Sequence, residues 1–313
     1  MPASVCVIGS SNTDMVIKAD KLPAPGETII GGTFLMNAGG KGANQAVAAV
    51  RLAASEPDLA SVTFVANVGN DVFGQQARQQ FDQEGLRTDF VTTDNQEPSG
   101  VALIGVDSRG ENSIMVASGA NARLSQTQVA TALATQPDST VVLLQLETPL
   151  PTVDYAIRQA HVRGMRVILN PAPAQPLNPS LLTCLHVITP NESEAELLTG
   201  IRVTDETTAW QAAQHLHEAG VPNVVITLGS KGAYLSTEGE STFVSAPPVT
   251  AVDTTAAGDC FNGALAVALA ESLPLLEAVT FACKAASISV TRMGAQASMP
   301  RRYEVDTLPL ASA

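Results

Sequence analysis

Apolar and polar residues alternate along the chain in two rhythms, one typical of buried strands and one typical of amphipathic helices. Short runs rich in β-branched residues predict strands at Val5–Ile8, Val62–Ala66, Thr140–Leu146, Arg166–Leu169, Val187–Thr189 and Val224–Thr227. Between them, as in Ala43–Ala53, apolar residues recur every three or four positions, which predicts helices. This alternation indicates an α/β fold with a doubly wound, mostly parallel sheet flanked by helices.

Two of the predicted helices carry recognisable ends. A helical pattern that includes Phe81 stops before Gly85, a typical C-cap. A second helix, around residues 209–216, is expected to begin behind Thr204 with an acidic first turn and to end before Gly220.

Two stretches interrupt this rhythm. Residues 28–36 and 99–117 carry several β-type runs without the helices expected between parallel strands. They predict a small antiparallel sheet beside the main one, placed to act as a lid. We therefore expect one domain over residues 1–313, with a lid formed from about 12–38 and 97–118, and a plain surface connection over Ala54–Ala60.

The composition narrows the functional classes. Of the 313 residues, 45% are hydrophobic, which fits a folded globular protein. The net charge of −13 argues against nucleic acid or an anionic membrane as a partner, because both would need a basic surface. Four cysteines without a C-x-x-C pair, and an N-terminus without a signal-peptide pattern, predict a cytoplasmic protein with reduced thiols. The scattered histidines argue against a zinc site, and the missing G-x-S-x-G elbow argues against a serine hydrolase.

Polar residues follow most of the predicted strands. Asn12 and Asp14 come after the first, Glu147 after the third, Asn170 after the fourth and Asn191 after the fifth. In an open parallel sheet, ligands bind in the crevice at the carboxyl ends of the strands. These side chains, which suit sugar hydroxyls or metal-bound water, therefore predict a binding crevice at that edge.

The segment "VDTTAAGDCFNGAL" (252–265) combines an anion site with a carboxylate. Ala256, Ala257 and Gly258 are small, so they leave main-chain N–H groups uncovered where a helix begins and its dipole favours negative charge. Asp259 follows directly. A carboxylate in that place makes sense if a proton leaves one group while a phosphoryl group arrives; the alternative is that Asp259 is an ordinary helix N-cap.

Two further motifs point to phosphate and metal chemistry. In "NAGGKGANQAV" (37–47), the glycines allow close approach of a ligand, and Lys41 and Asn44 offer hydrogen-bond donors. The motif is not a Walker A loop, because Gly42 and not serine or threonine follows the lysine. The alternative is that the glycines only form a tight connection between a strand and a helix. In "TPNESEAELLTG" (189–200), Glu192 and Glu194 either complement a helix dipole or hold water around Mg²⁺.

With "VITLGSKGAYL" (225–235), these motifs resemble the PfkB family of carbohydrate kinases over essentially the whole chain, and within it the ribokinases. The resemblance implies ATP-dependent phosphorylation of D-ribose at its 5-hydroxyl. One alternative is a sibling kinase that acts on 2-deoxyribose, a nucleoside or a fructose phosphate. A non-enzymatic alternative is a catalytically silent sugar-binding sensor, against which the intact Gly258-Asp259 pair argues.

The resemblance also implies roles for individual residues. Asp259 would be the general base, beside an anion hole formed by Ala256, Ala257, Gly258 and the Asp259 amide. The pentose would be held by Asn12, Asp14, Gly40, Lys41, Gly42, Asn44 and Glu147. ATP would lie along Asn191, Thr227, Gly229, Ser230, Gly232 and Gly258, with Asn262 and Cys283 nearer the adenine.

For cations, assembly and sugar preference, the resemblance implies four further features. Glu194 would order Mg²⁺ through water. A potassium ion would be held, mostly through backbone carbonyls, by Asp253, Thr255, Ser289, Arg292, Gly294 and Ser298. Two chains would pair through the lid, and Asn12 would lie towards the 2-hydroxyl of the sugar, where relatives that prefer 2-deoxyribose are expected to carry an apolar residue.

Overall fold

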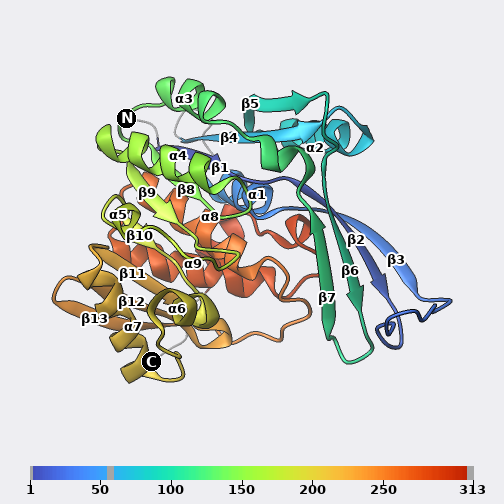
Figure 1. Ribbon diagram of the computed structural model, residues 1–313. Helices are drawn as coiled ribbons and strands as arrows, with labels where there is room; N and C mark the ends of the chain where they lie inside the picture. Colours follow the sequence, from blue (N-terminus) through green and yellow to red (C-terminus); the bar gives the residue numbers. More distant parts are fainter. Residues whose placement is uncertain (1–2, 55–59, 309–313) are drawn as a thin grey trace.

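The computed structural model describes residues 3–54 and 60–308, and most of the expected connection over Ala54–Ala60 lies outside them. Two sheets of different size make up the β-structure (Figure 1). The main sheet contains β1 (Ala3–Ile8), β4 (Ala60–Gly69), β5 (Arg87–Asp94), β8 (Val141–Leu144), β9 (Arg166–Leu169), β10 (Val187–Ile188), β11 (Asn223–Thr227), β12 (Gly232–Thr237) and β13 (Glu240–Ser245). The second contains β2 (Asn12–Lys18), β3 (Thr33–Gly39), β6 (Gly100–Val106) and β7 (Asn112–Ala117).

The helices connect these strands. They are α1 (Lys41–Leu52), α2 (Val72–Glu84), α3 (Gln126–Ala134), α4 (Leu150–Val162), α5 (Pro179–Leu182), α6 (Glu192–Thr199), α7 (Glu206–Glu218), α8 (Ala257–Ala270), α9 (Leu275–Ser289) and α10 (Arg302–Thr307). Short 3₁₀ turns lie at η1 (Gly119–Arg123), η2 (Gly229–Lys231) and η3 (Gln296–Ser298). No helix among these described segments is long and apolar enough to cross a membrane.

The main sheet has the strand order β13-β12-β11-β10-β9-β8-β1-β4-β5. All its pairings from β11 to β5 are parallel, and the β11–β12 and β12–β13 pairings are antiparallel, so only β12 runs against the other strands. The chain builds outward from β1 in one direction through β4 and β5, and then in the other through β8 to β11. The doubly wound, mostly parallel sheet is confirmed, and its order reverses beside β1, where such sheets bind ligands.

Helices cover both faces of this sheet. One apolar cluster joins α1, α8 and α9 to one face, and a second joins α3, α4 and α7 to the other. Both clusters include alternate residues of the same strands: Val5 and Val7 of β1 belong to one, and Cys6 and Ile8 to the other. The strands are therefore buried on both faces, which explains why they appear in the sequence as continuous apolar runs.

The second sheet, with the order β3-β2-β6-β7, stands away from the main body (Figure 1). Its strands account for the expected small sheet, but two details of the prediction were wrong. β3 begins at Thr33 rather than at residue 28, because Gly31 and Gly32 adopt positive φ angles of 108° and 94°, which do not continue a strand. The sheet was expected to be antiparallel, whereas β2 and β6 pair in parallel, because residues 19–99 separate these two strands and include a crossover through the main sheet. Asn12 and Asp14 follow β1 as expected and lie on β2, within the expected bounds of the lid.

Helix ends follow the local sequence with small shifts. Gly85 caps α2 in the left-handed conformation, with φ 83°, as expected. The cap of α7 is Asp205 and not Thr204, since the Asp205 carboxylate accepts from the Thr208 N–H. α1 begins at Lys41, two residues before the expected start.

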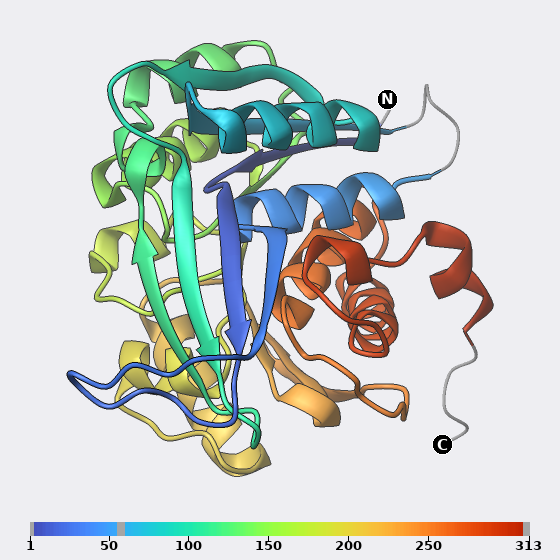
Figure 2. The ribbon, with the colours of Figure 1, turned by 90° about the vertical axis from the view of Figure 1, so that its right-hand side faces the viewer.

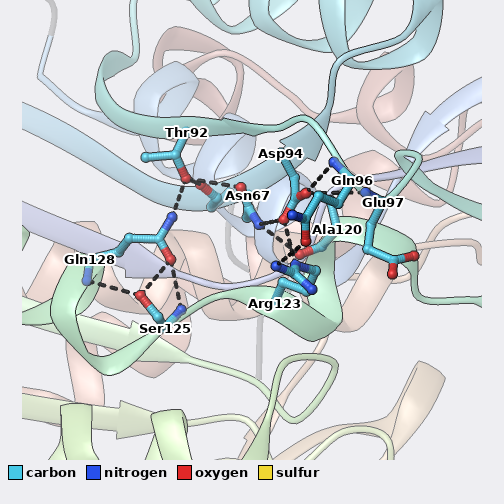
Figure 3. Close-up of polar contacts among 10 residues, drawn as sticks. Asn67, Thr92, Asp94, Gln96, Glu97, Ala120, Arg123, Ser125 and Gln128 are labelled. Atoms are coloured by element: carbon cyan, nitrogen blue, oxygen red, sulfur yellow. Dashed lines mark hydrogen bonds and ion pairs between the residues drawn. The ribbon is translucent and has the colours of Figure 1, made fainter.

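A polar network fixes the segment that leads from β5 into β6 (Figure 3). The carboxylate of Asp94 accepts from the N–H groups of Gln96 and Glu97 and from the Arg123 guanidinium. Asn67 joins the same group and donates to the Ala120 carbonyl at 3.0 Å. These main-chain hydrogen bonds, from Gln96 first, lower the pKa of Asp94 to about 2. The network anchors η1 at the base of the second sheet.

Small residues allow α1 and α8 to pack closely. A Cβ on Gly263 of α8 would lie 2.6 Å from the Ala48 side chain and 2.6 Å from the Gln45 carbonyl oxygen of α1. At the start of α1, a Cβ on Gly42 would lie 2.5 Å from the Ser10 nitrogen. The first turns of both helices are thereby held at the carboxyl end of β1.

Candidate active site

Asp259 lies in the first turn of α8, where two side-chain amides from α1 hold its carboxylate. The Asn44 Nδ2 donates to Oδ2 at 2.9 Å, and the Gln45 Nε2 donates to Oδ1 at 2.9 Å. The carboxylate caps no N–H group of its own helix, whose N-cap is Ala256. The alternative of an ordinary N-cap therefore fails. Burial raises the pKa of Asp259 above its ordinary value.

Main-chain N–H groups surround this carboxylate at the start of α8. The amides of Ala256, Gly258 and Asp259 have no hydrogen-bond partner among the described residues. Ala256 adopts a left-handed conformation, with φ 60°, ahead of right-handed residues, an arrangement that forms an anion-binding concavity. The Ala257 amide differs from the expectation, because it donates to the Thr254 carbonyl at 3.2 Å and so closes the preceding turn.

Four carboxylates and one ammonium group influence one another at this edge of the sheet. Burial alone would lower the pKa of Lys41, but Asp259, Glu147, Glu194 and Asp14 together raise it. The cluster therefore holds a surplus of negative charge around a protonated lysine. A polyanionic ligand can enter only where amides or added cations offset that surplus.

Asp14 faces this cluster from β2. Its carboxylate lies over Gly39, where an added Cβ would be 2.2 Å from Oδ2. The pKa of Asp14 is raised to about 6, first by burial and then by the charges of Glu147 and Asp259. No hydrogen bond to this carboxylate occurs within the described part of the chain, so both its oxygens remain for donors such as sugar hydroxyls.

Asn12, on the same face of β2, has an amide of fixed orientation. Its Oδ1 accepts from the Asn121 Nδ2 at 2.8 Å, and Asn121 also bonds both main-chain groups of Ser11. A carbonyl held in this way leaves the Asn12 NH₂ group for another acceptor. Asn121 was not predicted, and an isolated asparagine in η1 offers little sequence signal.

Glu147 lies at the N-terminus of α1. Its Oε2 accepts from the Lys41 main-chain N–H at 3.0 Å and from the Ser10 Oγ at 2.5 Å. Ser10 in turn accepts from the Gly42 N–H at 3.3 Å. The preceding Gly40 has φ 86°, and a Cβ there would lie 2.7 Å from the Asn12 nitrogen, so the turn requires glycine. This arrangement brings the predicted sugar-binding residues of three segments together.

The residues expected along the nucleotide lie at the ends of β10 and β11. Asn191 and Thr227 form a parallel bridge, and Asn191 caps α6. Gly229 and Ser230 follow in η2 and are exposed. Gly232 has φ 112°, and its missing side chain allows the backbone of β13 to approach, since a Cβ would lie 2.0 Å from the Val244 carbonyl oxygen.

Asn262 and Cys283 are buried, and their described contacts are internal. Asn262 donates to the Gly258 carbonyl at 2.8 Å and accepts from the Thr189 Oγ1 at 2.6 Å. It therefore braces the first turn of α8 against the end of β10. The Cys283 Sγ lies 3.9 Å from the Val244 carbonyl, and burial raises the pKa of its thiol to about 12. Contact of either residue with an adenine stays a prediction.

Glu194 takes part in a capping box at the start of α6. Its Oε2 accepts from the Asn191 N–H at 2.9 Å, while its own N–H donates to the Asn191 Oδ1 at 2.8 Å. Its other oxygen has no partner among the described bonds, and burial raises the pKa of this carboxyl group. Such an oxygen fits water around a divalent cation. Within residues 3–54 and 60–308, no cluster of three or more histidine, cysteine or acidic side chains could hold a metal directly.

Asp253 joins residues 254–259, here called the anion loop, to the segment after α9. Its carboxylate accepts from the Thr255 N–H at 2.9 Å and from the Gly294 N–H at 2.8 Å. Ser289 and Ser298 instead donate to carbonyls of their own turns, and the guanidinium of Arg292 pairs with Glu304. Of the six residues expected around potassium, the Asp253 carboxylate joins Thr255 and Gly294, and the Arg292 N–H donates to the Ser289 carbonyl at 3.2 Å. Any contribution of Ser289, Arg292 and Ser298 to a cation site would come from their main chains.

Two glutamines belong to the site but were not predicted. Gln45 contacts Asp259 directly, and Gln145 donates to the Gln45 Oε1 at 2.5 Å. Gln145 interrupts the apolar run that includes β8, a signal that a buried polar group is needed there. Gln45 adjoins Asn44 in the glycine-rich motif, but its contact across 214 positions depends on helix packing.

Comparisons with known proteins agree with this geometry. A family model described as pfkB family carbohydrate kinase matches residues 2–302. A ribokinase of Haemophilus influenzae is 46% identical, covering 97% of each chain, and a deoxyribokinase of Salmonella typhi is 36% identical, covering 95% of each. The solved structure of Arabidopsis thaliana ribokinase complexed with ribose and ATP has a TM-score of 0.87 at 34% identity, covering 97% of this chain and 98% of that one. The chain belongs to the pfkB family of carbohydrate kinases.

Proposed function

We propose that this chain transfers the γ-phosphoryl group of ATP to the 5-hydroxyl of D-ribose, giving D-ribose 5-phosphate and ADP. The observation that carries the proposal is the Asp259 carboxylate, held by two amides beside main-chain N–H groups without partners in the described residues. The names of relatives similar over nearly their full length support ribose as the substrate.

In this proposal, Asp259 is the general base. Its carboxylate takes the proton of the 5-hydroxyl while that oxygen bonds to the γ-phosphorus and the bond to the β-phosphate oxygen breaks. The amides of Ala256, Gly258 and Asp259 stabilise the charge on the transferred group. The raised pKa supports the role, because burial makes the carboxylate a stronger base.

The pentose would lie between β2 and the start of α1, held by Asn12, Asp14, Gly40, Lys41, Gly42, Asn44 and Glu147. Unused hydrogen-bonding groups support this position. The Asn44 Oδ1 is buried without a partner among the described residues, and the Asp14 carboxylate has none either. Such groups gain stabilisation when a ligand hydroxyl pairs with them.

ATP would lie along Asn191, Thr227, Gly229, Ser230, Gly232 and Gly258, with Asn262 and Cys283 towards the adenine. The exposed η2 turn and the open space at Gly258, where a Cβ would meet nothing within 4 Å, support this path. Main-chain groups would supply most of the contacts to the phosphates here. They would position the phosphates without adding charged side chains.

Two cations complete the proposal. Mg²⁺, ordered through water at Glu194, would neutralise phosphate charge that the carboxylate cluster otherwise repels. Potassium, held near Asp253, Thr255, Ser289, Arg292, Gly294 and Ser298, would rigidify the anion loop. The bonds from Thr255 and Gly294 to Asp253 support a loop whose position matters.

We further propose that the second sheet is a lid of a single domain and pairs two chains. Its register places Ile17, Phe34, Met36, Leu103 and Met115 together on the face opposite Asp14. These side chains are about half exposed or more, and in Figure 2 the loop between β2 and β3 crosses only the far end of this sheet. An apolar face of this kind marks a contact surface. Sedimentation at micromolar concentration should show a dimer; a stable monomer would contradict the pairing.

The decisive experiment for the reaction is a coupled ADP-release assay with ribose, 2-deoxyribose, nucleosides and fructose phosphates. Ribose should give the highest kcat/KM, with product phosphorylated at the 5-position by NMR. Preference for another sugar would assign the chain to a sibling kinase, and binding without ADP release would indicate a silent sensor. The four thiols, all unpaired in the described chain, support a reducing cytoplasmic location.

A further inference from the structure

The carboxylate of Asp259 is held by a chain of amides that reaches beyond the substrate-facing residues. Gln45, which is fully buried, uses one hydrogen of its Nε2 for the Asp259 Oδ1 at 2.9 Å and the other for the Asn170 Oδ1 at 3.0 Å. Both hydrogens of this amide are therefore committed. Asn44 meets the other oxygen of the carboxylate, so each carboxylate oxygen has one fixed donor.

The orientation of the Gln45 amide is itself determined from outside the site. Gln145 donates its Nε2 to the Gln45 Oε1 at 2.5 Å, and the Asn170 Nδ2 donates to the Thr189 carbonyl at 3.3 Å. If the Gln45 amide turned over, its oxygen would face the Asp259 carboxylate and its NH₂ would face the NH₂ of Gln145. The turned oxygen would also face the Asn170 Oδ1, so the two acceptors on Asp259 and Asn170 fix the orientation of the Gln45 amide. Gln145, whose own Oε1 has no partner among the described residues, supports this orientation through one hydrogen bond.

We propose that Gln45 is a positioning residue for phosphoryl transfer, which keeps the Asp259 carboxylate ionised and oriented towards the substrate, and that Gln145 supports the orientation in which Gln45 does so. The proposal rests on the proposed role of Asp259 as the general base. Each carboxylate oxygen has two lone pairs, so the donors from Gln45 and Asn44 leave capacity for the proton of the sugar hydroxyl.

The expected effect of losing Gln45 has a definite sign. A hydrogen bond to the ionised form favours that form, so its removal raises the pKa of the carboxyl group. Lys41, Asp14, Glu147 and Glu194 are the charged groups that face Asp259, and none of them changes in the variants proposed here. A shift between parent and variant therefore reports the amide contact alone.

The test is the pH dependence of kcat/KM for ribose in Gln45→Met, which keeps length and burial but removes the donor. We expect the acidic limb to move up by about one pH unit, the size expected for losing a hydrogen bond to a charged group. At pH 7, kcat should fall by about tenfold, while KM for ribose should change by less than about threefold, since Gln45 has no contact in the proposed sugar site.

Gln136→Met is the matched control. Gln136 is also buried and hydrogen-bonded, but its partners Thr63 and Ala132 lie at the opposite end of the sheet. Its loss should lower the melting temperature without moving the acidic limb. A merely structural role for Gln45 would give the same result as this control, and the proposal would be overturned.

Gln145→Met tests the second half of the proposal and serves if Gln45→Met does not fold. It should move the limb in the same direction by a smaller amount, and the double variant should match Gln45→Met, because Gln145 acts through Gln45. An unmoved limb in Gln145→Met, or additive shifts in the double variant, would contradict this. If Asp259→Asn retained native turnover, the base assignment itself would fail; an inactive Asp259→Asn with an unmoved limb in Gln45→Met would overturn only the positioning role.

Discussion

The Asn44 side-chain amide donates to the Asp259 carboxylate at 2.9 Å, although 215 positions separate them in the sequence. One residue belongs to the glycine-rich motif at the start of α1, and the other to the anion loop at the start of α8. The close contact of Gly263 with α1 holds the two helices together. The proposed sugar site and the proposed base are therefore parts of one rigid unit.

Asp259→Asn should remove proton acceptance and retain the fold. Asn44 can turn its unpaired Oδ1 towards the new NH₂ group, so the local hydrogen bonds can be restored. We expect kcat to fall at least ~10²-fold, the lower end for loss of a general base, with ribose affinity largely kept. Steady-state kinetics and ribose calorimetry measure both quantities; near-native turnover would show that Asp259 is not the base.

Gly258→Ala separates the anion site from the fold. A Cβ at this position would meet no protein atom within 4 Å, and alanine favours a helix over glycine by about 0.5–1 kcal/mol. We therefore expect an unchanged or higher melting temperature together with at least a ~10-fold loss of kcat, because the methyl group would occupy the space proposed for the phosphoryl group. Full activity of this variant would show that the phosphoryl group does not bind at Gly258.

Asp14→Asn should stabilise the ligand-free protein at neutral pH. The folded pKa of Asp14, about 6, lies above its ordinary value of 3.8, so between these values the folded state binds more protons than the unfolded state. The ionised group therefore costs stability as pH rises through this window. The variant should gain about 1–2 kcal/mol at pH 7 after solvent screening, and the gain should vanish near pH 3.

Thermal or urea unfolding of Asp14→Asn at several pH values measures this gain. The same variant should lose ribose affinity, because the amide replaces one of the two acceptor oxygens proposed for the sugar. Equal stability of parent and variant at all pH values would mean that Asp14 is not electrostatically strained.

Ribose should be preferred to 2-deoxyribose, and Asn12→Met should reduce the preference. Asn121 holds the Asn12 carbonyl, which leaves the NH₂ group for the 2-hydroxyl. An amide without its hydroxyl partner costs ~1–3 kcal/mol, or roughly 5- to 150-fold in kcat/KM. The measurement is kcat/KM for both sugars in both proteins. Equal values in the parent, or a ratio that the substitution leaves untouched, would exclude Asn12 as the reader of the 2-hydroxyl.

Activity should depend on potassium. Asp253 bonds Gly294 and Thr255, so a cation beside it would hold the loop that carries the anion-binding amides without taking part in the chemistry. Exchange of K⁺ for Na⁺ or tetramethylammonium at constant ionic strength should lower kcat/KM. Unchanged values across the three salts would remove potassium from the proposal.

Much of the fold could be predicted from the sequence, because its signals are local. Continuous apolar runs such as that of β9 are buried on both faces by the same layered packing in any protein of this class, and Gly85 ends α2 through its own backbone freedom. The expected lid bounds include β2, but no β-type run predicted this strand by itself, since its polar residues face a site and not a core. Pairing with β3 and β6 decides its conformation.

The order of residues along the chain already specifies which groups are available for chemistry: the small residues before Asp259, the glycine-rich turn and the polar residues after the strands. Which of these groups meet depends on how the folded chain packs. The Gln45 contact with Asp259 and the support from Gln145 depend on how closely α1, α8 and the sheet approach. The Ala257 N–H donates to the Thr254 carbonyl within the preceding turn, so it is not free for an anion. Motifs specify residue types over a few positions, whereas the partners of a buried amide are set by segments hundreds of residues apart, through packing and the need to satisfy every buried polar group.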